Sequence, residues 1–431
     1  MKAVITAGGK GTRLSSIAND IPKPMVSVVG KPILEYQINC LKENGIKDIF
    51  IIIGHFGSII RNYFKDGSAF GVNIKYIEEK EPLGSAGSLF YLRKELNDDF
   101  VFLFGDLMLD VFFEKMIEFH IKNKAMITLL SHPNSHPFDS DLIIADANNL
   151  VVGIDSKHNV RNYFYHNLVN SGVYVVSNHI FGKYFKEPKK TDFAKDVVNI
   201  ELKNNTVYSY HSTEYVKDAG TPNRYHSVCK DVEAGIVKAK NLRNPQKCVF
   251  LDRDGTINKY VGFARDLNQI ELEENSSIGL KDINKSSFIS IVITNQPVIA
   301  RGEVTFEQLR EINNKIETLL GKDGTYFDDL FFCPHHPDRG FDGEVPSLKF
   351  DCDCRKPKIG LLLQAKEKYN IDLTKSFFVG DTTLDIQTGI NAGMKTILVK
   401  TGEKGEDNKY DVEPDFVINS LAELKNIIGG E

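Results

Sequence analysis

The chain has 431 residues, of which 42% are hydrophobic and 26% charged, and its 53 basic and 58 acidic side chains leave a net charge of -5. These values indicate an ordinary globular protein with sizeable hydrophobic cores and two or three domains. No basic block of the kind that follows a nucleic-acid backbone is present, so nucleic-acid binding is not expected.

The sequence also predicts a cytoplasmic protein without a membrane anchor. A core strand is expected directly at the N-terminus, and no apolar stretch reaches the length of about 18 residues typical of a membrane-spanning helix. Of the six cysteines, three cluster near residues 333–354 and three are scattered, which argues against a disulfide framework. The expected partners are therefore small molecules, and the sequence does not determine the oligomeric state.

Short apolar segments that alternate with amphipathic segments predict an α/β fold with largely parallel sheets. Strands are expected at residues 3–7, 49–53, 100–104, 172–176, 248–251, 289–293, 376–380 and 395–399, and helices at segments such as 32–44 and 305–320. A charged, helix-like stretch at residues 231–241 leads into Arg243-Asn244-Pro245. We expect two doubly wound, Rossmann-like domains, residues 1–232 and 246–431, joined by a linker at residues 233–245.

A glycine-rich loop, residues 8–14, follows the first predicted strand. Glycines let the backbone approach a polyphosphate, so that successive amide groups point into one anionic pocket, and Arg13 adds a cation. The same loop also suits a tight strand-to-helix turn that binds nothing. Lys23, between two prolines, either holds its ammonium group over the phosphates or is a solvated lysine in a rigid turn.

Two carboxylates in the first half predict a Mg²⁺ site. Asp106 follows a continuous apolar strand, at the strand end where α/β proteins bind ligands. Asp218 stands beside a turn at residues 217–222. Two carboxylates and substrate phosphates are a common way to hold Mg²⁺, although each aspartate alone is also a common cap or turn residue.

These motifs make the first domain resemble the sugar-1-phosphate nucleotidyltransferases. The matching segments occur in the family's order at residues 8–14, 22–25, 81–87, 105–106, 170–172 and 218–222. The resemblance implies that the anomeric phosphate of a sugar attacks the α-phosphate of a nucleoside triphosphate, and that pyrophosphate leaves without a covalent enzyme intermediate. Catalysis then rests on positioning and on neutralising charge.

The resemblance also implies roles for single residues in the first domain. Arg13 and Lys23 would be the catalytic cations on the triphosphate, and Asp106 and Asp218 would hold Mg²⁺. Asn170 and Lys157 would contact the sugar phosphate, although residues 155–158 replace the family's usual Glu-Lys-Pro and Phe104 replaces a frequent polar residue. The implied nucleotide-binding residues are Ala7, Gly8, Gly9, Gly11, Thr12, Arg13, Lys23 and, near the base, Gly84.

The second half opens with another phosphate-handling pattern, residues 252–256, after an apolar strand. The side chains of Asp252 and Asp254 leave an extended strand on the same side, so both can meet one phosphate. One carboxylate can attack phosphorus while the other donates a proton, provided that a cation such as Mg²⁺ limits their repulsion. The alternative is a turn in which both aspartates are caps and Gly255 supplies the bend.

Three later features favour the catalytic interpretation: Thr294 at a strand end, the cations of residues 355–356, and Asp381 after another strand. Together with residues 252–256 they resemble the haloacid dehalogenase superfamily. The resemblance implies Asp252 as the nucleophile that forms an aspartyl-phosphate and Asp254 as general acid and then base. The implied Mg²⁺ ligands are Asp252, the Asp254 carbonyl group and Asp381, and the implied phosphate and sugar ligands are Thr294, Asn295, Arg301, Arg355 and Lys356.

Three cysteines and one histidine in the second half form a candidate zinc site. Cys333, His335, Cys352 and Cys354 are the ligands expected for a closed tetrahedral Zn²⁺ site. The alternatives are a disulfide, disfavoured in a reducing cytoplasm, and unliganded cysteines. Four protein ligands would make this Zn²⁺ structural, and it would fix the loop that directs residues 355–356 at the substrate.

The second half resembles in particular the D-glycero-D-manno-heptose 1,7-bisphosphate phosphatases and, more distantly, the histidinol-phosphate phosphatases. The matching segments are residues 252–258, 294–296, 299–302, 333–337 and 352–357. The two resemblances imply GDP-heptose synthesis: removal of the 7-phosphate from D-glycero-α-D-manno-heptose 1,7-bisphosphate, then transfer of GMP from GTP to the heptose 1-phosphate. The alternatives are a transferase for mannose 1-phosphate or another hexose 1-phosphate beside an unrelated phosphatase, and a domain that only binds.

Overall fold

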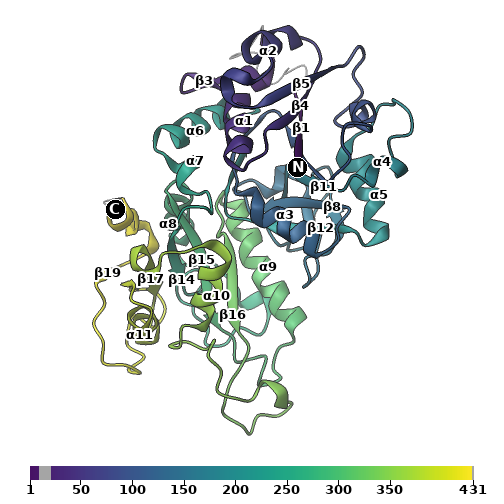
Figure 1. Ribbon diagram of the computed structural model, residues 1–431. Coiled ribbons are helices and arrows are strands. Elements are labelled where there is room, and N and C mark those ends of the chain that lie inside the picture. The colour runs from purple at the N-terminus through teal and green to yellow at the C-terminus, as the bar shows by residue number, and fades with distance from the viewer. Residues whose placement is uncertain (9–20, 430–431) are drawn as a thin grey trace. The chain divides into compact units, whose positions relative to one another are not determined.

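The structure, a computed structural model, describes residues 1–8 and 21–429 (Figure 1). The chain divides into two compact units. The first contains Met1–His132, Ile143–Ser156 and Asn170–Asn241, and the rest of the chain forms the second unit. Two short pieces of the first half of the sequence, Pro133–Leu142 and Lys157–Val169, therefore belong to the second unit.

A mixed sheet forms the centre of the first unit, and its described strands lie in the order β10-β9-β11-β6-β1-β4-β5, while β8 pairs with β11 and β12 pairs with β8. Strands β1, β4, β5 and β6 are parallel, whereas β11 is antiparallel to β6. The strands are β1 Lys2–Thr6, β4 Asp48–Ile53, β5 Asn73–Glu78, β6 Phe100–Phe104, β8 Ile127–His132, β9 Leu142–Ala145, β10 Val151–Asp155, β11 Val169–Val176 and β12 Val207–His211. Two short ribbons complete the strands of this unit, β2 Ser27–Val28 with β3 Lys31–Pro32, and β7 Leu107–Asp110 with β13 Tyr215–Asp218.

The second unit has a parallel sheet with the strand order β16-β15-β14-β17-β18-β19. The strands are β14 Lys247–Leu251, β15 Phe288–Asn295, β16 Asp329–Cys333, β17 Phe377–Gly380, β18 Lys395–Val399 and β19 Phe416–Ile418. The chain runs outward from β14 in one direction to β16 and then returns to build β17, β18 and β19 on the other side. The order reverses beside β14, and ligands of open α/β sheets bind at the carboxyl strand ends of such a switch point.

Helices accompany both sheets. In the first unit they are α1 Ile33–Glu43, α2 Gly57–Phe64, α3 Phe113–Lys122, α4 Ile180–Lys183, α5 Asn199–Glu201, α6 Pro222–Glu233 and α7 Ile236–Ala239. In the second unit they are α8 Ser276–Asn284, α9 Phe306–Lys322, α10 Gly360–Tyr369, α11 Thr383–Asn391 and α12 Lys425–Ile428. None of the helices in the described parts of the chain combines the length and the apolar character that crossing a membrane requires.

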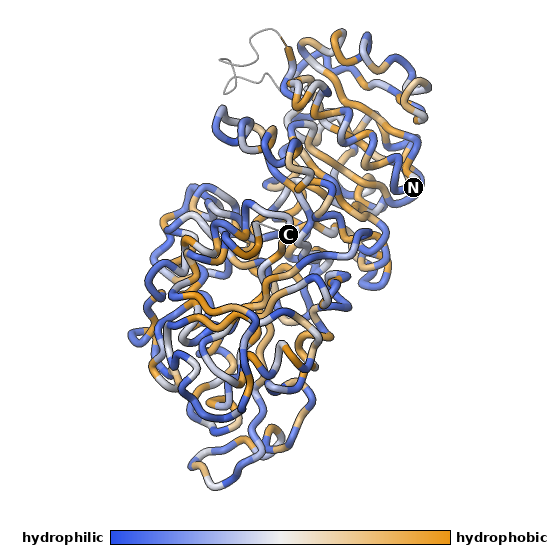
Figure 2. The backbone as a smooth tube through the Cα atoms, turned by 90° about the vertical axis from the view of Figure 1, so that its left-hand side faces the viewer, coloured by the Kyte–Doolittle hydropathy of each residue, from blue (hydrophilic) through white to orange (hydrophobic). Residues whose placement is uncertain are grey.

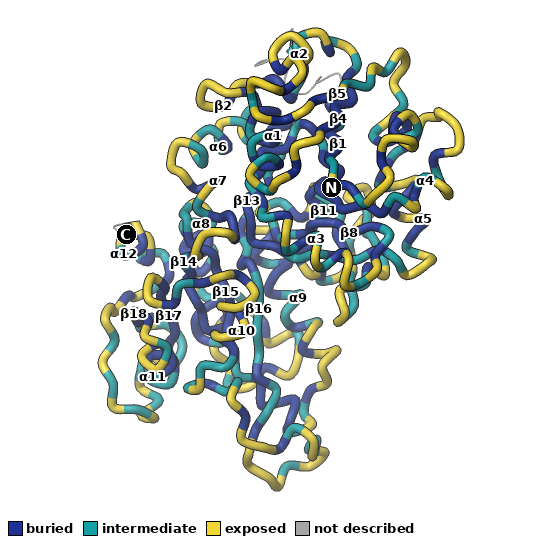
Figure 3. The backbone as a smooth tube through the Cα atoms, in the orientation of Figure 1, coloured by how far each residue is buried: buried dark blue, intermediate teal, exposed yellow. Residues whose placement is uncertain are grey.

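Continuous apolar runs form the central strands because neighbouring elements cover both faces of a parallel sheet. Residues 3–5 of β1 and residues 248–251 of β14 are fully buried. Hydrophobic stretches run along the inner strands in Figure 2, and the same strands are drawn as buried in Figure 3. The hydrophobic cores of the two units are thus built from the segments that the sequence predicts as strands.

The fold class predicted from the sequence is confirmed, with two local differences. Strand β11 is antiparallel to its neighbour β6 rather than part of a parallel sheet. The helix-like stretch at residues 231–241 is interrupted, because α6 ends at Glu233 and α7 begins at Ile236. Gly235 between them has φ +72°, a left-handed conformation that ends helices and that glycine adopts without strain.

Candidate active sites

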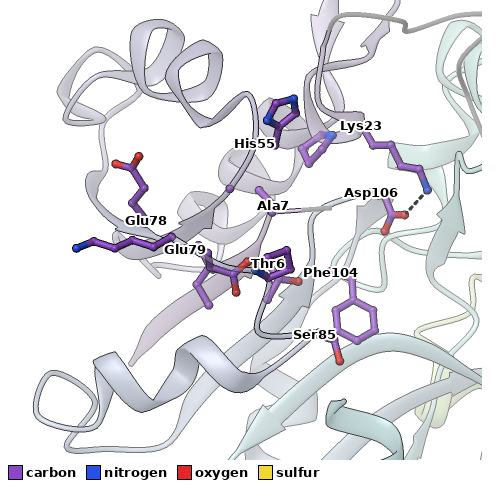
Figure 4. A pocket seen from close by; sticks show the side chains of 16 residues that line it. Thr6, Ala7, Lys23, His55, Glu78, Glu79, Ser85, Phe104 and Asp106 are labelled. Carbon is purple, nitrogen blue, oxygen red and sulfur yellow. Dashed lines mark hydrogen bonds and ion pairs between the residues drawn. The ribbon is translucent and has the colours of Figure 1, made fainter. Parts of the chain in front are cut away.

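A cavity of about 770 Å³ opens in the first unit at the carboxyl ends of β1, β4 and β6 (Figure 4). Parallel strands bring their carboxyl ends to one edge of a sheet, which explains why loops distant in sequence meet here. The predicted site residues that line the cavity are Ala7, Gly8, Lys23, Gly84 and Asp106. The other predicted nucleotide-binding residues, Gly9, Gly11, Thr12 and Arg13, lie outside the described residues.

Lys23 and Asp106 face each other in this cavity (Figure 4). The Lys23 ammonium group lies 3.4 Å from Asp106 Oδ2. Lys23 begins a short 3-10 turn that Pro22 precedes in extended conformation, so the local backbone directs the side chain inward. A cation and a carboxylate at one strand end suit a triphosphate and its metal ion.

Asp218 lies beside Asp106, because β13 pairs with β7 so that Asp218 is opposite Leu107. The guanidinium group of Arg224, in the first turns of α6, donates to both Asp218 carboxylate oxygens at 3.1 and 2.9 Å. A Cβ atom at Gly220 would lie 2.8 Å from Asp218 Oδ1 and 3.9 Å from Lys23 Nζ. The absence of a side chain at position 220 therefore leaves room where these charged groups converge.

Glu79 is a residue of this cavity that the sequence analysis missed. Ser88 Oγ donates to Glu79 Oε1 at 2.6 Å. Burial raises the pKa of Glu79, although hydrogen bonds from Ser88 and the Leu83 backbone oppose the change. A Cβ atom at Gly8 would lie 2.8 Å from Glu79 Oε2, so glycine keeps that oxygen accessible. Glu79 directly follows β5, and a carboxylate at the carboxyl end of a parallel strand is a feature by which the sequence could have identified it.

The two residues predicted to contact the sugar phosphate lie in different units. Asn170, near the start of β11, donates from Nδ2 to the Tyr174 hydroxyl at 2.9 Å. Phe104, the departure from the family pattern, lines the cavity and packs against Tyr174, with ring centroids 5.9 Å apart. Lys157, in the second unit, donates from its backbone N–H to Asp141 Oδ1 at 2.9 Å.

In the second unit, Asp252 and Asp381 follow the neighbouring strands β14 and β17, as predicted. Oxygens of Asp252, Asp381 and Asp385 all lie within 4.8 Å of one another. The Lys356 ammonium group lies 2.7 Å from Asp252 and 2.6 Å from Asp385. The structure therefore brings the predicted nucleophile, cation and metal ligand into one buried cluster.

The electrostatics of this cluster fit a divalent cation. Burial and the neighbouring Asp385 carboxylate raise the pKa of Asp252 to about 7, although Lys356 opposes the rise. Burial and the charges of Asp252 and Asp385 raise the pKa of Asp381 to about 8. Asp381 Oδ1 is buried and has no hydrogen-bond partner among residues 1–8 and 21–429. A Mg²⁺ ion would relieve the repulsion between the carboxylates and satisfy this oxygen.

Asp254 is held by donors that the sequence analysis did not identify. Arg253 donates from Nη2 to Asp254 Oδ2 at 2.8 Å, and the side-chain amides of Asn258 and Gln296 donate to the same carboxylate at 2.9 and 3.0 Å. The Arg253 side chain is fully buried and also donates to Asn313 Oδ1 in α9 at 2.9 Å. These contacts orient the predicted general acid.

The other predicted phosphate ligands surround this cluster. Thr294 Oγ1, at the end of β15, accepts a hydrogen bond from Gln296 at 2.9 Å. Asn295 uses its side chain to bind the backbone of Lys356, with Lys356 N donating to Asn295 Oδ1 at 3.0 Å. Asn295 therefore helps to fix the backbone of Lys356, a role that was not predicted from the sequence.

Cys333, His335, Cys352 and Cys354 converge as predicted, with their ligand atoms within 4.8 Å of one another. The three Sγ–Sγ distances are 3.5, 3.3 and 3.1 Å, and His335 Nδ1 lies 3.2 Å from Cys354 Sγ. Such separations approach the edges of a tetrahedron whose centre lies about 2.3 Å from each sulfur. All six cysteines of the chain are free, so the group is not paired in disulfides.

Beside this group lies a basic cluster, formed by Arg301, His336, Lys349 and Arg355. Arg301 Nη2 is 3.2 Å from His336 Nε2, and its guanidinium group lies 4.6 Å from the centre of the Phe341 ring. Burial, Arg355 and Arg301 lower the pKa of His336. The buried atoms Arg301 Nε, His336 Nδ1 and Lys349 Nζ lack hydrogen-bond partners within the described chain.

The charges near the basic cluster do not balance. Lys349 has Glu344 Oε2 at 3.5 Å, and His336 has the exposed Asp338 at 3.8 Å. Gathering several cations in a partly buried loop is unfavourable unless an anion joins them. The cluster therefore suits a phosphate group. Lys349 extends the set of cations predicted from the sequence, and His336 adds an imidazole whose lowered pKa favours the neutral form.

Comparison with known proteins relates the two halves of the chain to known enzymes. Residues 2–235, more than half of the chain, match the family described as nucleotidyl transferase. The chain belongs to the nucleotidyl transferase family. Residues 353–424 of this nucleotidyl transferase also match the HAD-hydrolase-like family, so a haloacid dehalogenase-like unit follows the transferase unit, as predicted.

The second half of this nucleotidyl transferase is similar to several phosphatases. One relative is D-glycero-alpha-D-manno-heptose-1,7-bisphosphate 7-phosphatase of Photorhabdus laumondii, 42% identical over 186 residues, which are 43% of this chain and 98% of the relative. Another is D-glycero-beta-D-manno-heptose-1,7-bisphosphate 7-phosphatase of Yersinia pestis, 36% identical over 181 residues, which are 42% of this chain and 94% of the relative.

Solved structures are similar to each half. HddC from Yersinia pseudotuberculosis has 25% sequence identity and a TM-score of 0.46, covering 54% of this chain and 99% of its own. A D,D-heptose 1,7-bisphosphate phosphatase from B. bronchiseptica, complexed with magnesium and phosphate, has 27% identity and a TM-score of 0.38, covering 43% of this chain and all of its own.

Proposed function

We propose that the chain is a bifunctional enzyme of GDP-heptose synthesis. The phosphatase, residues 246–431, removes the 7-phosphate from D-glycero-α-D-manno-heptose 1,7-bisphosphate. The transferase, residues 1–232, then transfers GMP from GTP to the heptose 1-phosphate, and residues 233–245 link the two. The observation that carries the proposal is the presence in one nucleotidyl transferase chain of a second half 42% identical to an α-anomer 7-phosphatase.

In the phosphatase reaction, Asp252 attacks the phosphorus atom of the 7-phosphate, and Asp254 gives a proton to the departing sugar oxygen. Asp254 then takes a proton from the water that hydrolyses the aspartyl-phosphate. Support comes from the Lys356 contact at 2.7 Å, which stabilises ionised Asp252, and from the donors that orient Asp254. Asp252, the Asp254 carbonyl group and Asp381 would hold Mg²⁺, which would supply positive charge for the phosphoryl group.

The basic cluster supports a bisphosphate as the substrate. Its cations lack a matching number of anionic neighbours, which favours binding of a second phosphate group away from Asp252. Holding the 1-phosphate there presents only the 7-phosphate to the nucleophile. This regiochemistry is required, since loss of the anomeric phosphate would remove the acceptor of the transferase.

In the transferase reaction, Arg13 and Lys23 neutralise the triphosphate while the sugar phosphate attacks in line, and Asp106 and Asp218 would hold Mg²⁺. Asn170 contacts that sugar phosphate. The contact between Lys23 and Asp106 in the cavity supports a shared phosphate and metal site.

Glu79 supports guanine as the base. Guanine presents two adjacent donors, the N1–H and the 2-amino group, to a carboxylate acceptor. Adenine presents an acceptor beside its amino group, and uracil flanks its N–H with two carbonyl oxygens, so a carboxylate fits both less well. Glu79 lines the same cavity as Gly84, the residue expected near the base.

We further propose that Cys333, His335, Cys352 and Cys354 bind a structural Zn²⁺. Four ligands complete a tetrahedral site and leave no open position for chemistry. A bound Zn²⁺ would fix the backbone of Arg355 and Lys356, because these residues directly follow Cys354. Free cysteines and thiolate ligation are in keeping with a cytoplasmic location.

The test is incubation of the whole chain with the α-anomer of heptose 1,7-bisphosphate, GTP and Mg²⁺. We expect orthophosphate, pyrophosphate and GDP-heptose, with the anomeric phosphate retained in the intermediate by ³¹P NMR. The β-anomer, mannose 1-phosphate and the other nucleoside triphosphates form comparison arms. Release of the 1-phosphate, or faster turnover of mannose 1-phosphate than of heptose 1-phosphate, would contradict the proposal.

A further inference from the structure

Two segments from the transferase half of the sequence, Pro133–Leu142 and Lys157–Val169, lie in the second unit, and we call them the docked segments. They are bound to each other: Asn167 Nδ2 donates to the Asn134 carbonyl group at 2.8 Å, and Asn134 N donates to Asn167 Oδ1 at 3.2 Å. Leu142, Tyr165 and Val169 form a small hydrophobic core between them. The docked segments are therefore an ordered substructure of the second unit.

Helix α9 of the same unit binds three consecutive residues of the second docked segment. Thr318 Oγ1 accepts from Tyr165 N at 2.9 Å. Glu317 Oε2 accepts from Asn167 N at 2.7 Å and lies 2.8 Å from His166 Nδ1. Glu317 is 8% exposed and Thr318 is 3% exposed, so these are buried polar contacts, whose loss leaves a charge unsatisfied.

Charge complementarity strengthens this attachment. Burial opposes protonation of His166, but the Glu317 carboxylate outweighs burial and raises the pKa of His166 above its ordinary value. Gly321, one turn further along α9, lies against the first docked segment, since a Cβ atom there would come within 2.7 Å of Pro137 Cγ. Residues 317, 318 and 321 share one face of α9, and that face carries both docked segments.

The second docked segment leads directly into a residue assigned to the sugar phosphate, because Asn170 follows its last residue, Val169. We propose that Glu317 and Thr318 are positioning residues for the transferase: helix α9 fixes the segment that leads into Asn170. This inference rests on the proposed function, which assigns a sugar-phosphate contact to Asn170.

The inference predicts a selective effect on one substrate. Freeing residues 165–167 from α9 raises the KM for the sugar 1-phosphate, because the segment that leads into Asn170 is then no longer held in place. The glycine loop, Lys23 and Asp106 belong to other segments, so the KM for GTP stays unchanged. The Asp252 cluster does not contact Glu317, so phosphate release also stays unchanged.

The experiment compares Glu317→Ala with the wild type and with Glu307→Ala in the whole chain. Glu307 lies in the same helix, but its carboxylate is 61% exposed and pairs with Arg310. We expect Glu317→Ala to raise the KM for the sugar 1-phosphate roughly tenfold, as expected for the loss of hydrogen bonds to a charged group. Glu317→Gln keeps an acceptor for Asn167 N and restores part of the loss, whereas Glu307→Ala behaves like the wild type.

Hydrogen exchange of residues 165–167 provides a second readout, independent of substrate, and is expected to accelerate in Glu317→Ala only. An unchanged KM for the sugar phosphate, with or without faster exchange, would overturn the inference, as would an equal rise in the KM for GTP. The proposed function is tested separately, by measuring which sugar 1-phosphate the wild type uses as acceptor. If the wild type prefers another sugar 1-phosphate, the KM comparison uses that acceptor, and if it transfers to none, both proposals are wrong.

Discussion

Glu79 and Asp381 illustrate how single side chains acquire chemistry from their surroundings. Each is a carboxylate beside the end of a parallel strand, and burial raises the pKa of both. Glu79 has Ser88 and a glycine-lined space beside it, which suits a hydrogen-bonding ligand. Asp381 has two further carboxylates beside it, which suits a cation. Neighbouring groups, rather than residue type, make one carboxylate suited to a hydrogen-bond donor and the other suited to a metal ion.

At position 79, we expect Glu79→Gln to lower kcat/KM for GTP by about 10- to 100-fold, because the amide replaces one acceptor with a donor that opposes the guanine donors. Turnover of the four nucleoside triphosphates by the purified variant measures the change in preference. Glu78→Gln is the matched control, since Glu78 lines the same cavity but its carboxylate is 70% exposed. Equal losses of kcat/KM for GTP in the two variants would show that Glu79 does not recognise the guanine base.

The raised pKa values of Asp252, about 7, and Asp381, about 8, predict how metal binding depends on pH. Both lie above the ordinary value of 3.8, so the folded metal-free state binds protons more tightly than the unfolded chain. Its stability is therefore lost as the pH rises through 7 to 8, where both carboxylates ionise beside each other. Mg²⁺ binds the ionised form, so it stabilises more at high pH.

Unfolding temperatures with and without Mg²⁺, at about pH 6 and pH 9, measure this linkage. We expect a larger Mg²⁺-induced rise at the higher pH, and a much smaller difference in Asp381→Asn. A rise that is equal at both values, or greater at the lower one, would refute the proposed metal site.

The loop between β16 and α10 contains one short 3-10 turn, and side-chain contacts bring its two ends together. Cys333 ends β16, whereas Cys352 and Cys354 lie shortly before Arg355, Lys356 and α10. The four candidate ligands join the two ends of the loop, which also carries Lys349 and Phe341 of the basic-cluster region. A metal at this position would hold both Lys356 and the basic cluster.

Removal of this metal is expected to affect one activity. Cys352→Ser should lower phosphatase kcat/KM by roughly 100-fold, because a displacement of positioning groups by about 1 Å has an effect of that size. GTP-dependent transfer should stay intact. Elemental analysis of the wild type should find about one Zn²⁺ per chain, and less in the variant. Cys229→Ser, outside the ligand group, is the control. Full phosphatase activity without zinc would contradict a structural role.

On the scale of the whole molecule, the chain combines two sheets, each with reactive groups at its carboxyl edge. The predicted transferase residues Lys23 and Asp106 line the cavity of the first unit, and the aspartate cluster lies in the second. The docked segments are the exception, since residues from the transferase half of the sequence lie in the second unit. The groups proposed for the two chemical steps therefore belong to separate clusters.

This separation predicts that each activity can be removed alone. Asp252→Asn should reduce phosphate release by about a thousandfold or more while transfer to supplied heptose 1-phosphate continues, because it removes the nucleophile. Asp106→Ala should abolish transfer and leave phosphate release intact. Parallel assays of orthophosphate and nucleotide-sugar measure both. Loss of both activities in either variant would show that the sites do not act separately.

The sequence by itself determined the α/β fold, the central strands of both sheets and the residues at the ends of those strands, whereas strands such as β5, β8 and β16 were not predicted. A continuous apolar run such as residues 248–251 can only be buried, and the parallel order of such strands brings Asp252, Thr294 and Asp381 to one edge. Close spacing likewise marked Cys352 and Cys354 as candidate metal ligands, and the structure brings them together with Cys333 and His335. These are local signals, and no long-range contact is needed to detect them.

Only the tertiary structure decided which partners surround those residues. Three contacts illustrate this. Arg253 donates to Asn313, which is 60 residues away. Gly8 lies against Glu79, 71 residues away, and Tyr165 N donates to Thr318, 153 residues away. Side chains so distant in sequence meet only when helices and sheets pack, and hydrophobic periodicity carries no information about that pairing. Orientation, shifted pKa values and the docked segments arise from this packing, which is why the chemistry of each site became specific only in the folded chain.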